Sequence, residues 1–225
     1  MVRFQAVASD FDGTLTDEGR VSSATLAALA RVRESGRKLI LITGRELESL
    51  REVLPQLDQF DLVVAENGAL LYSPVSGEER ALCQLPPARF LEALHRHGVA
   101  PISIGRGVIA TVRPHDAMVA QVIGELGLDL QIIFNREAVM ILPAGVNKGA
   151  GLKAALAELG LPGAAVVGIG DAENDYAFLR LCGFSVAVAN AIPSLKEQVQ
   201  LVTSGAAGAG VAEVVQKLVV TGTLP

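Results

Sequence analysis

The chain has 225 residues, of which 50% are hydrophobic and 19% are charged. This is enough apolar material to bury a sizeable core, so an intrinsically disordered protein is excluded. The net charge of −5 argues against a nucleic-acid partner, because nucleic-acid-binding surfaces are usually basic. No apolar run reaches the roughly 18 residues that suggest a membrane span, and the start lacks a signal-peptide layout. We therefore expect a soluble, cytoplasmic enzyme with no membrane partner.

The two cysteines, Cys83 and Cys182, lie far apart and away from every polar motif described below. We interpret them as free thiols in a reducing compartment, with a disulfide as the minority interpretation.

The first predicted strand, residues 4–8, leads into the sequence DFDGTLT at residues 10–16. Asp10 and Asp12 place two carboxylates, followed by a glycine, at the mouth of the predicted sheet, where open α/β folds bind ligands. This arrangement favours the handling of phosphate with a metal ion. Acids are also common in solvated turns after strands, so the pair by itself leaves both interpretations open.

The next elements continue a strand-helix alternation. Ser22 or Ser23 is predicted to cap a helix that ends near Gly36. A second apolar run, residues 38–42, then stops at Thr43-Gly44-Arg45, which offers a hydroxyl group and a freely rotating backbone at a strand end. A third run, residues 61–65, is followed by Glu66-Asn67-Gly68-Ala69. This order predicts a parallel sheet with right-handed crossovers.

The pattern changes near residue 83 to helix, strand, strand, helix, strand, strand, which predicts a small antiparallel sheet with two helices. Alternation over one of these strands places Val108, Ala110 and Val112 on one face and Ile109, Thr111 and Arg113 on the other. Which face packs on the helices and which looks toward the rest of the protein stays open.

The last third of the chain returns to the larger sheet. Lys148 opens a helix with apolar residues at helical spacing, and a buried run at residues 164–169 ends in Gly170-Asp171-Ala-Glu-Asn174-Asp175. Residues 205–210, rich in alanine and glycine, are interpreted as a loop before an amphipathic last helix. Because the carboxyl ends of parallel strands share one edge, we expect all these polar clusters to converge there.

The motifs DFDGTLT, TGR, the lysine of NKG and GDAENDY occur in the order found in phosphatases of the haloacid dehalogenase superfamily, which this chain resembles. Two softer matches, at Asn67 and Asn190, resemble its Cof-type subgroup. The resemblance implies an α/β fold, with a Rossmann-like parallel-sheet core at residues 1–82 and 145–225. A small α+β cap domain at residues 83–144 would be inserted between the second and third motifs and would determine substrate specificity.

The resemblance also implies roles for the acidic residues. Asp10 would be the nucleophile that forms an aspartyl-phosphate, and Asp12 the general acid and base. Mg²⁺ would be the cofactor, bound by Asp10, the backbone carbonyl of Asp12 and Asp171, with Asp175 as a ligand directly or through water. For Asp171 and Asp175, helix N-capping is the alternative.

Phosphate binding is assigned by the same resemblance to Thr43, Gly44, Lys148 and, more weakly, Asn174. The alternatives are a strand-end turn for Thr43 and an exposed helix lysine for Lys148. The three histidines are interpreted as surface or cap residues rather than metal ligands.

The function implied is hydrolysis of a small phosphorylated metabolite, with phosphoglycolate or a sugar phosphate as natural candidates. We expect Arg113 or Arg106 to meet a second anionic or hydroxylated group of the substrate. A phosphomutase or phosphotransferase with the same intermediate is the alternative, and a receiver-like phosphate-binding module ranks lower. The oligomeric state is not predicted.

Overall fold

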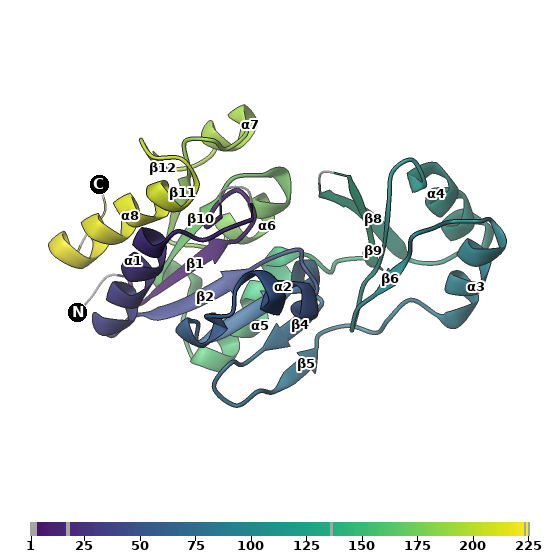
Figure 1. The fold of residues 1–225 in the computed structure, drawn as a ribbon, viewed down its shortest axis with the longest axis horizontal. Helices are drawn as coiled ribbons and strands as arrows, with labels where there is room; N and C mark the ends of the chain where they lie inside the picture. The colour runs from purple at the N-terminus through teal and green to yellow at the C-terminus, as the bar shows by residue number, and fades with distance from the viewer. Residues whose placement is uncertain (1–3, 17–18, 136, 223, 225) are drawn as a thin grey trace.

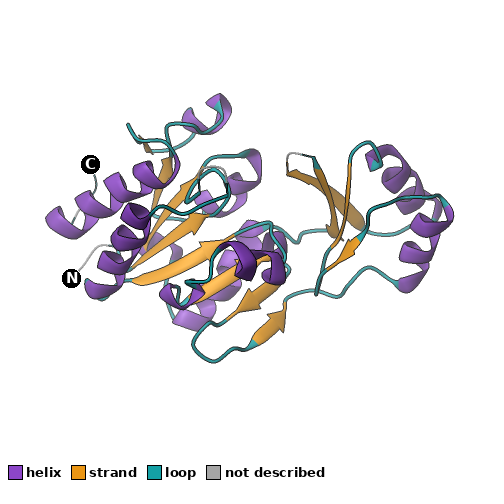
Figure 2. Ribbon diagram, in the orientation of Figure 1, coloured by secondary structure: helices purple, strands orange, loops and turns teal. Residues whose placement is uncertain are grey.

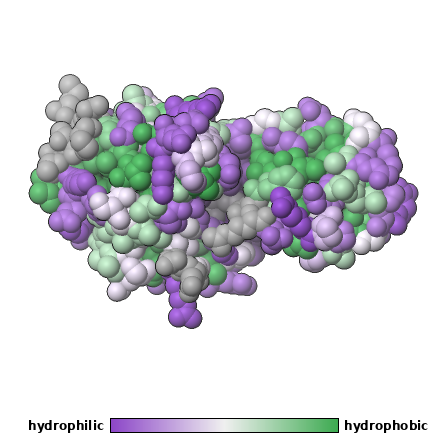
Figure 3. Space-filling model, turned by 90° about the horizontal axis from the view of Figure 1, so that it is seen from above, coloured by the Kyte–Doolittle hydropathy of each residue, from purple (hydrophilic) through white to green (hydrophobic). Residues whose placement is uncertain are grey.

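A computed structural model describes residues 4–16, 19–135, 137–222 and 224. The chain forms a larger lobe that contains α1 and α8 and a smaller lobe that contains α3 and α4 (Figure 1). Seen from above, the two lobes lie end to end (Figure 3). Each lobe is built on its own β-sheet.

The sheet of the larger lobe has the strand order β12-β11-β10-β1-β2-β3-β4-β5. Its strands are β1 (Ala6–Asp10), β2 (Lys38–Ile42), β3 (Leu62–Ala65), β4 (Leu70–Tyr72), β5 (Glu79–Ala81), β10 (Val166–Gly170), β11 (Phe184–Ala187) and β12 (Leu201–Val202). The strands from β12 to β3 pair in parallel. β4 and β5 pair antiparallel at one edge, a hairpin that the sequence pattern does not predict.

Helices cover both faces of this sheet (Figure 2). They are α1 (Ser23–Glu34), α2 (Leu47–Val53), α5 (Lys148–Leu159), α6 (Tyr176–Leu179), α7 (Pro193–Lys196) and α8 (Ala207–Thr221), with short 3₁₀ turns η1 (Leu57–Gln59), η2 (Glu66–Gly68), η3 (Gly163–Ala165) and η4 (Glu173–Asp175). α1 packs on α8, whereas α5 packs against β2, β3 and β4. As predicted, Ser22 caps α1, because its hydroxyl oxygen accepts a hydrogen bond from the Thr25 amide at 3.1 Å.

The start of α8 corrects the interpretation of residues 205–210 as a loop, because the helix begins at Ala207. A Cβ atom on Gly208 would lie 2.2 Å from Oγ1 of Thr25, a residue of α1. The glycine therefore allows the two helices to approach closely, and its role in the sequence is packing rather than chain flexibility.

The smaller lobe contains a four-stranded antiparallel sheet with the order β6-β7-β9-β8. Its elements are α3 (Ala88–Arg96), β6 (Ser103–Ile104), β7 (Ile109–Val112), α4 (Asp116–Glu125), β8 (Leu130–Asn135) and β9 (Ala138–Pro143). Ile109 packs with Phe90 and Val119 of the helices, whereas Val108 packs with Ala69 of the larger lobe. Val108, which precedes β7, and Ala110 therefore lie on the side that looks toward the larger lobe. This decides which of the two faces packs on the cap helices, a question that the sequence left open.

The predicted fold class is confirmed: the protein has an α/β architecture with a central parallel sheet and an extra antiparallel sheet that fits a cap. We call the smaller lobe the cap and keep residues 83–144 as its proposed bounds. Cys83 and Cys182 are both free. Among the described residues, no helix combines the length and the apolar character needed to cross a bilayer.

Candidate active site

The loop after β1 brings the first acidic motif against the loop after β10. Asp10 is the last residue of β1, and Thr14 Oγ1 donates a hydrogen bond to Asp171 Oδ1 at 2.9 Å. Between them, Gly13 has φ +86°, and a Cβ atom there would lie 2.4 Å from Asp171 Oδ2. Only glycine fits both the backbone conformation and the space, so the glycine of the motif allows the two acidic loops to meet.

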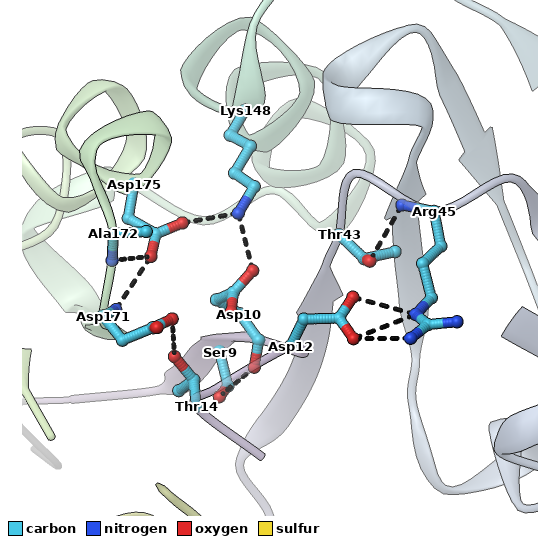
Figure 4. A network of polar contacts seen from close by, with 10 residues as sticks. All are labelled: Ser9, Asp10, Asp12, Thr14, Thr43, Arg45, Lys148, Asp171, Ala172 and Asp175. Carbon is cyan, nitrogen blue, oxygen red and sulfur yellow. Dashed lines mark hydrogen bonds and ion pairs between the residues drawn. The ribbon is translucent and has the colours of Figure 1, made fainter. Parts of the chain in front are cut away.

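Lys148, the first residue of α5, lies between two carboxylates (Figure 4). Its Nζ atom is 2.6 Å from Asp10 Oδ1 and 2.5 Å from Asp175 Oδ1. Only 2% of the lysine side chain is exposed, so the interpretation as a surface helix lysine is wrong. Burial by itself would lower the lysine pKa, but Asp10 and Asp175 raise it above its ordinary value, which keeps a positive charge in the centre of the site.

The acids around this lysine repel one another. Burial raises the pKa of Asp10 well above its ordinary range, and the charge of Asp175 raises it further, while Lys148 opposes both. Burial followed by the charge of Asp175 also raises the pKa of Asp171. One buried ammonium group thus compensates only part of the negative charge, and a further cation would relieve the repulsion.

Asp175 closes the turn after β10. Its Oδ2 atom accepts hydrogen bonds from the backbone amides of Asp171 at 2.8 Å and Ala172 at 3.0 Å. Its other oxygen binds Lys148, and the side chain is fully buried. Asp175 thus makes no side-chain cap bond to α6, the helix that follows it; its carboxylate instead accepts the amide of Ala172, the residue before η4, and holds the lysine.

Asp10, Asp171 and Asp175 form the acidic cluster of the site, and one oxygen from each lies within 4.8 Å of the others. Carboxylate oxygens are the ligands preferred by hard divalent cations such as Mg²⁺, so the donor set fits such an ion. The carboxylate of Asp12 points away from this cluster (Figure 4).

Asp12 is paired instead with Arg45, a residue of the TGR motif. Arg45 Nε lies 3.0 and 2.8 Å from the two carboxylate oxygens of Asp12, and Nη2 lies 2.7 Å from Oδ1. The guanidinium also lies over the ring of Phe11, 5.5 Å from its centroid. The TGR motif predicts roles for Thr43 and Gly44, whereas the pairing of its arginine with Asp12 is not predicted from the sequence.

Thr43 is fully buried at the end of β2, where its hydroxyl oxygen accepts a hydrogen bond from the Arg45 amide at 3.1 Å. The η2 turn is attached to the same segment, because the amides of Glu66 and Asn67 donate to the carbonyl oxygens of Arg45 and Thr43. A Cβ atom on Gly68 would lie 2.1 Å from the carbonyl oxygen of Asn147. η2 therefore packs between the Thr43 turn and the start of α5.

Two clefts separate the cap from the residues around the acidic cluster. A cleft of about 450 Å³ is lined by Gly44 and Arg45 and by the inner face of β7. A second cleft of about 720 Å³ is lined by Asn67, Asn174 and Arg113, among others. Gly44 and Asn174 thus face open space beside the cluster.

Asn190 has a structural role. Its Nδ2 atom donates to the Gly13 carbonyl oxygen at 2.8 Å, and its Oδ1 atom accepts from the Ala207 amide at 2.7 Å. The residue thus ties the loop after β1 to the start of α8.

The cap is joined to the larger lobe by Glu66 and Arg106. The buried Glu66 carboxylate accepts hydrogen bonds from the amides of Arg106 and Gly107, both at 2.9 Å. The Arg106 side chain forms ion pairs with Glu48 at 2.7 Å and Glu79 at 2.9 Å. The guanidinium of Arg106 is therefore already ion-paired with Glu48 and Glu79. Of the two arginines that the sequence suggests for substrate contact, Arg113 is the remaining candidate.

Comparison with known proteins identifies the family of the chain. The pattern of the haloacid dehalogenase-like hydrolases matches residues 7–95 and 132–215. A phosphoglycolate phosphatase of Methanothermobacter thermautotrophicus is 34% identical over 222 residues, which cover 95% of this chain and 98% of that protein. A phosphoglycolate phosphatase of Archaeoglobus fulgidus is 32% identical, with 97% and 98% of the two chains covered.

Solved structures show the same fold. A haloacid dehalogenase-like hydrolase of Bacteroides thetaiotaomicron superposes with a TM-score of 0.81 at 20% identity, over 96% of this chain and 99% of that one. A HAD/Cof-like hydrolase of Plasmodium vivax gives a TM-score of 0.81 at 19% identity, over 96% and 95% of the two chains. The chain therefore belongs to the haloacid dehalogenase superfamily of hydrolases and is a phosphatase, a phosphoric monoester hydrolase.

Proposed function

We propose that this phosphatase hydrolyses a small phosphorylated metabolite, with phosphoglycolate as the first candidate and sugar phosphates as the next. The observation that carries the proposal is the buried ammonium group of Lys148 between Asp10 and Asp175, beside a third carboxylate. The choice of phosphoglycolate is supported by relatives described as phosphoglycolate phosphatases, which match nearly the whole chain.

In the proposed reaction, an Asp10 carboxylate oxygen attacks phosphorus and the bond from phosphorus to the alcohol oxygen breaks, which leaves an aspartyl-phosphate. Asp12 donates a proton to the departing alcohol and then accepts one from water. The water oxygen attacks phosphorus, inorganic phosphate leaves, and the Asp10 carboxylate is restored. Lys148 and the Thr43 hydroxyl bind phosphoryl oxygens, while Gly44 and Asn174 line the approach.

A bound Mg²⁺ would neutralise part of the phosphoryl charge. We assign its binding to Asp10, Asp171 and the backbone carbonyl of Asp12. Both oxygens of Asp175 already accept hydrogen bonds, so we assign Asp175 contact with the ion through water.

The alternatives differ in what accepts the phosphoryl group. A phosphomutase or phosphotransferase would pass it from Asp10 to a second hydroxyl group and release no inorganic phosphate. A receiver-like module would account for neither the cap nor a role of Asp12 as a general acid.

The test is phosphate release from a panel of phosphorylated metabolites, including phosphoglycolate and hexose phosphates, with Mg²⁺ and with Asp10→Asn as the inactive control. We expect inorganic phosphate and the free alcohol in equal amounts from the wild type. Formation of a new phosphate ester without inorganic phosphate would replace hydrolysis by transfer. No reaction with any ester would contradict the proposal.

A further inference from the structure

Asn67 is buried in η2 with its side-chain carboxamide unpartnered. The residue is 1% exposed, and neither Oδ1 nor Nδ2 has a hydrogen-bond partner in the structure. Buried polar groups in native proteins are almost always paired, so each exception needs an explanation. The backbone at Asn67 has φ +55°, a conformation that asparagine tolerates better than most residues.

The position of Asn67 offers an explanation. The backbone amide of Asn67 donates a hydrogen bond to the Thr43 carbonyl oxygen at 3.0 Å. The following residue, Gly68, packs against the backbone of Asn147 and Lys148. Asn67 therefore lies between the segments that contain Thr43 and Lys148, to which we assign phosphoryl binding, and the residue lines the cleft of about 720 Å³. A ligand in this cleft would supply the missing partner.

Arg113, in the segment after β7, lines the same cleft from the cap. Its guanidinium lies over the ring of Phe134, 4.7 Å from the ring centroid, and the side chain is exposed. Among the residues that the structure describes, no carboxylate forms an ion pair with it, whereas Arg45 and Arg106 both have acidic partners. Arg113 thus presents a guanidinium group whose paired N–H donors can bind both oxygens of a carboxylate.

The smaller cleft is less suitable for an anion. Its one arginine, Arg45, is neutralised by Asp12, Glu46 also lines it, and the cap contributes mainly apolar side chains. The larger cleft contains two arginines, Arg113 and Arg180, against a single acid, Glu173. Its lining therefore has a net positive charge in a protein that is acidic overall.

We propose that the cleft between Asn67 and Arg113 is the leaving-group subsite, and that it selects phosphate monoesters whose alcohol contains a carboxylate. This inference rests on the proposed phosphatase function and identifies the substrate class as phosphorylated hydroxy acids. Asn67 Nδ2 donates to the ester at the inner end of the cleft, and Arg113 binds the substrate carboxylate at the cap wall. Two anionic groups of one small substrate are then held between the lobes.

The first test compares phosphoglycolate with hydroxyethyl phosphate, in which the carboxylate is replaced by a neutral alcohol. In the wild type, kcat/KM should favour phosphoglycolate. Arg113→Ala should reduce this ratio by about tenfold or more, and Arg113→Lys should retain part of it. Arg96→Ala, which removes an exposed cap arginine of α3, is the charge-matched control and should leave the ratio unchanged. An unchanged ratio in Arg113→Ala would overturn the assignment.

The second test separates binding from folding. Asn67→Gly keeps a residue that tolerates positive φ and removes a carboxamide that makes no internal hydrogen bond, so the thermal unfolding midpoint should stay close to that of the wild type. Its kcat/KM for phosphoglycolate should fall about tenfold or more. Asn190→Ala, which removes a carboxamide with two internal partners, should instead lower the midpoint. An unchanged kcat/KM in Asn67→Gly would show that the side-chain carboxamide of Asn67 does not contact the substrate.

A wrong proposed function and a wrong subsite assignment give different experimental results. If the wild type releases phosphate from neither ester, the proposed function is wrong, and the subsite with it. If it hydrolyses both esters with equal kcat/KM, the phosphatase function stands and the selection of carboxylates is overturned.

Discussion

Arg45 holds both carboxylate oxygens of Asp12, with its Nε and Nη2 atoms 2.7 to 3.0 Å away. This pair turns Asp12 away from the acidic cluster formed by Asp10, Asp171 and Asp175 (Figure 4). A general acid must be held within reach of the leaving oxygen, so in the proposed mechanism the guanidinium orients Asp12 for that role. We therefore regard Arg45 as a positioning residue.

Arg45→Ala should slow the enzyme selectively, because it leaves Asp12 unoriented. Alkyl phosphates need protonation of the leaving group, whereas p-nitrophenyl phosphate needs little, so kcat should fall more for the alkyl ester. Asp12→Ala should show the same preference in stronger form. The measurement is the ratio of kcat values for the two esters in each variant. An equal loss on both esters would remove Asp12 from the role of general acid.

Asp10→Asn should abolish turnover without unfolding the protein. The amide keeps the size of the side chain but is a far weaker nucleophile than the carboxylate. Circular dichroism and the thermal unfolding midpoint would check the fold, and phosphate release would measure activity. Activity at the wild-type level would exclude Asp10 as the nucleophile.

Lys148→Ala should cost transition-state stabilisation on the order of 2 kcal/mol or more, seen as a fall in kcat/KM. The ammonium group is buried between Asp10 and Asp175, so its removal also leaves two neighbouring buried carboxylates without their cation. Lys153→Ala, on an exposed position of the same helix, is the matched control. A variant within about twofold of the wild type would show that the lysine is not needed for phosphoryl binding.

Removal of divalent cations should eliminate activity, and Mg²⁺ should restore it. Binding of the ion to the acidic cluster should also raise the thermal unfolding midpoint, because it relieves the repulsion among the carboxylates. The midpoint gives a readout independent of turnover, and Asp171→Asn should reduce its shift. Ca²⁺ should support activity poorly, because its larger and more flexible coordination shell misplaces the nucleophile. Full activity after exhaustive chelation would argue against a metal site.

Glu66 should make the joint between the lobes sensitive to pH. Burial raises its pKa above the ordinary value, although the amides of Arg106 and Gly107 act in the opposite direction. A carboxyl group with a raised pKa in the folded state binds protons more tightly there than in the unfolded state. Its contribution to stability is therefore fully present below the unfolded pKa and is lost as the pH rises through the folded pKa.

The measurement compares the wild type with Glu66→Gln in denaturant unfolding between about pH 4 and about pH 7. The free energy of unfolding of the wild type, relative to that of the variant, should be highest at the acidic end and decline as the pH rises. A difference that grows with pH would show that the two backbone hydrogen bonds outweigh burial.

The sequence by itself determined the fold class and the place where the polar motifs meet. Asp10 ends one strand, and Thr43 and Asp171 follow two others; the parallel pairing of these strands can be inferred from the alternation of strands and helices, and such strands end at one edge of the sheet. Lys148 was predicted from its motif to start a helix, and it does. These features depend on local periodicity and chain order, which a single sequence contains.

Only the tertiary structure decided which side chains are partners. Arg45 with Asp12, and Arg106 with Glu48 and Glu79, are pairs of residues distant in sequence, and no local pattern distinguishes an occupied arginine such as Arg106 from Arg113. The same holds for the start of α8, where Gly208 meets Thr25 across two helices. Asn67 is the sharpest case, because the absence of a partner for its carboxamide becomes visible only once every neighbouring donor and acceptor has been placed.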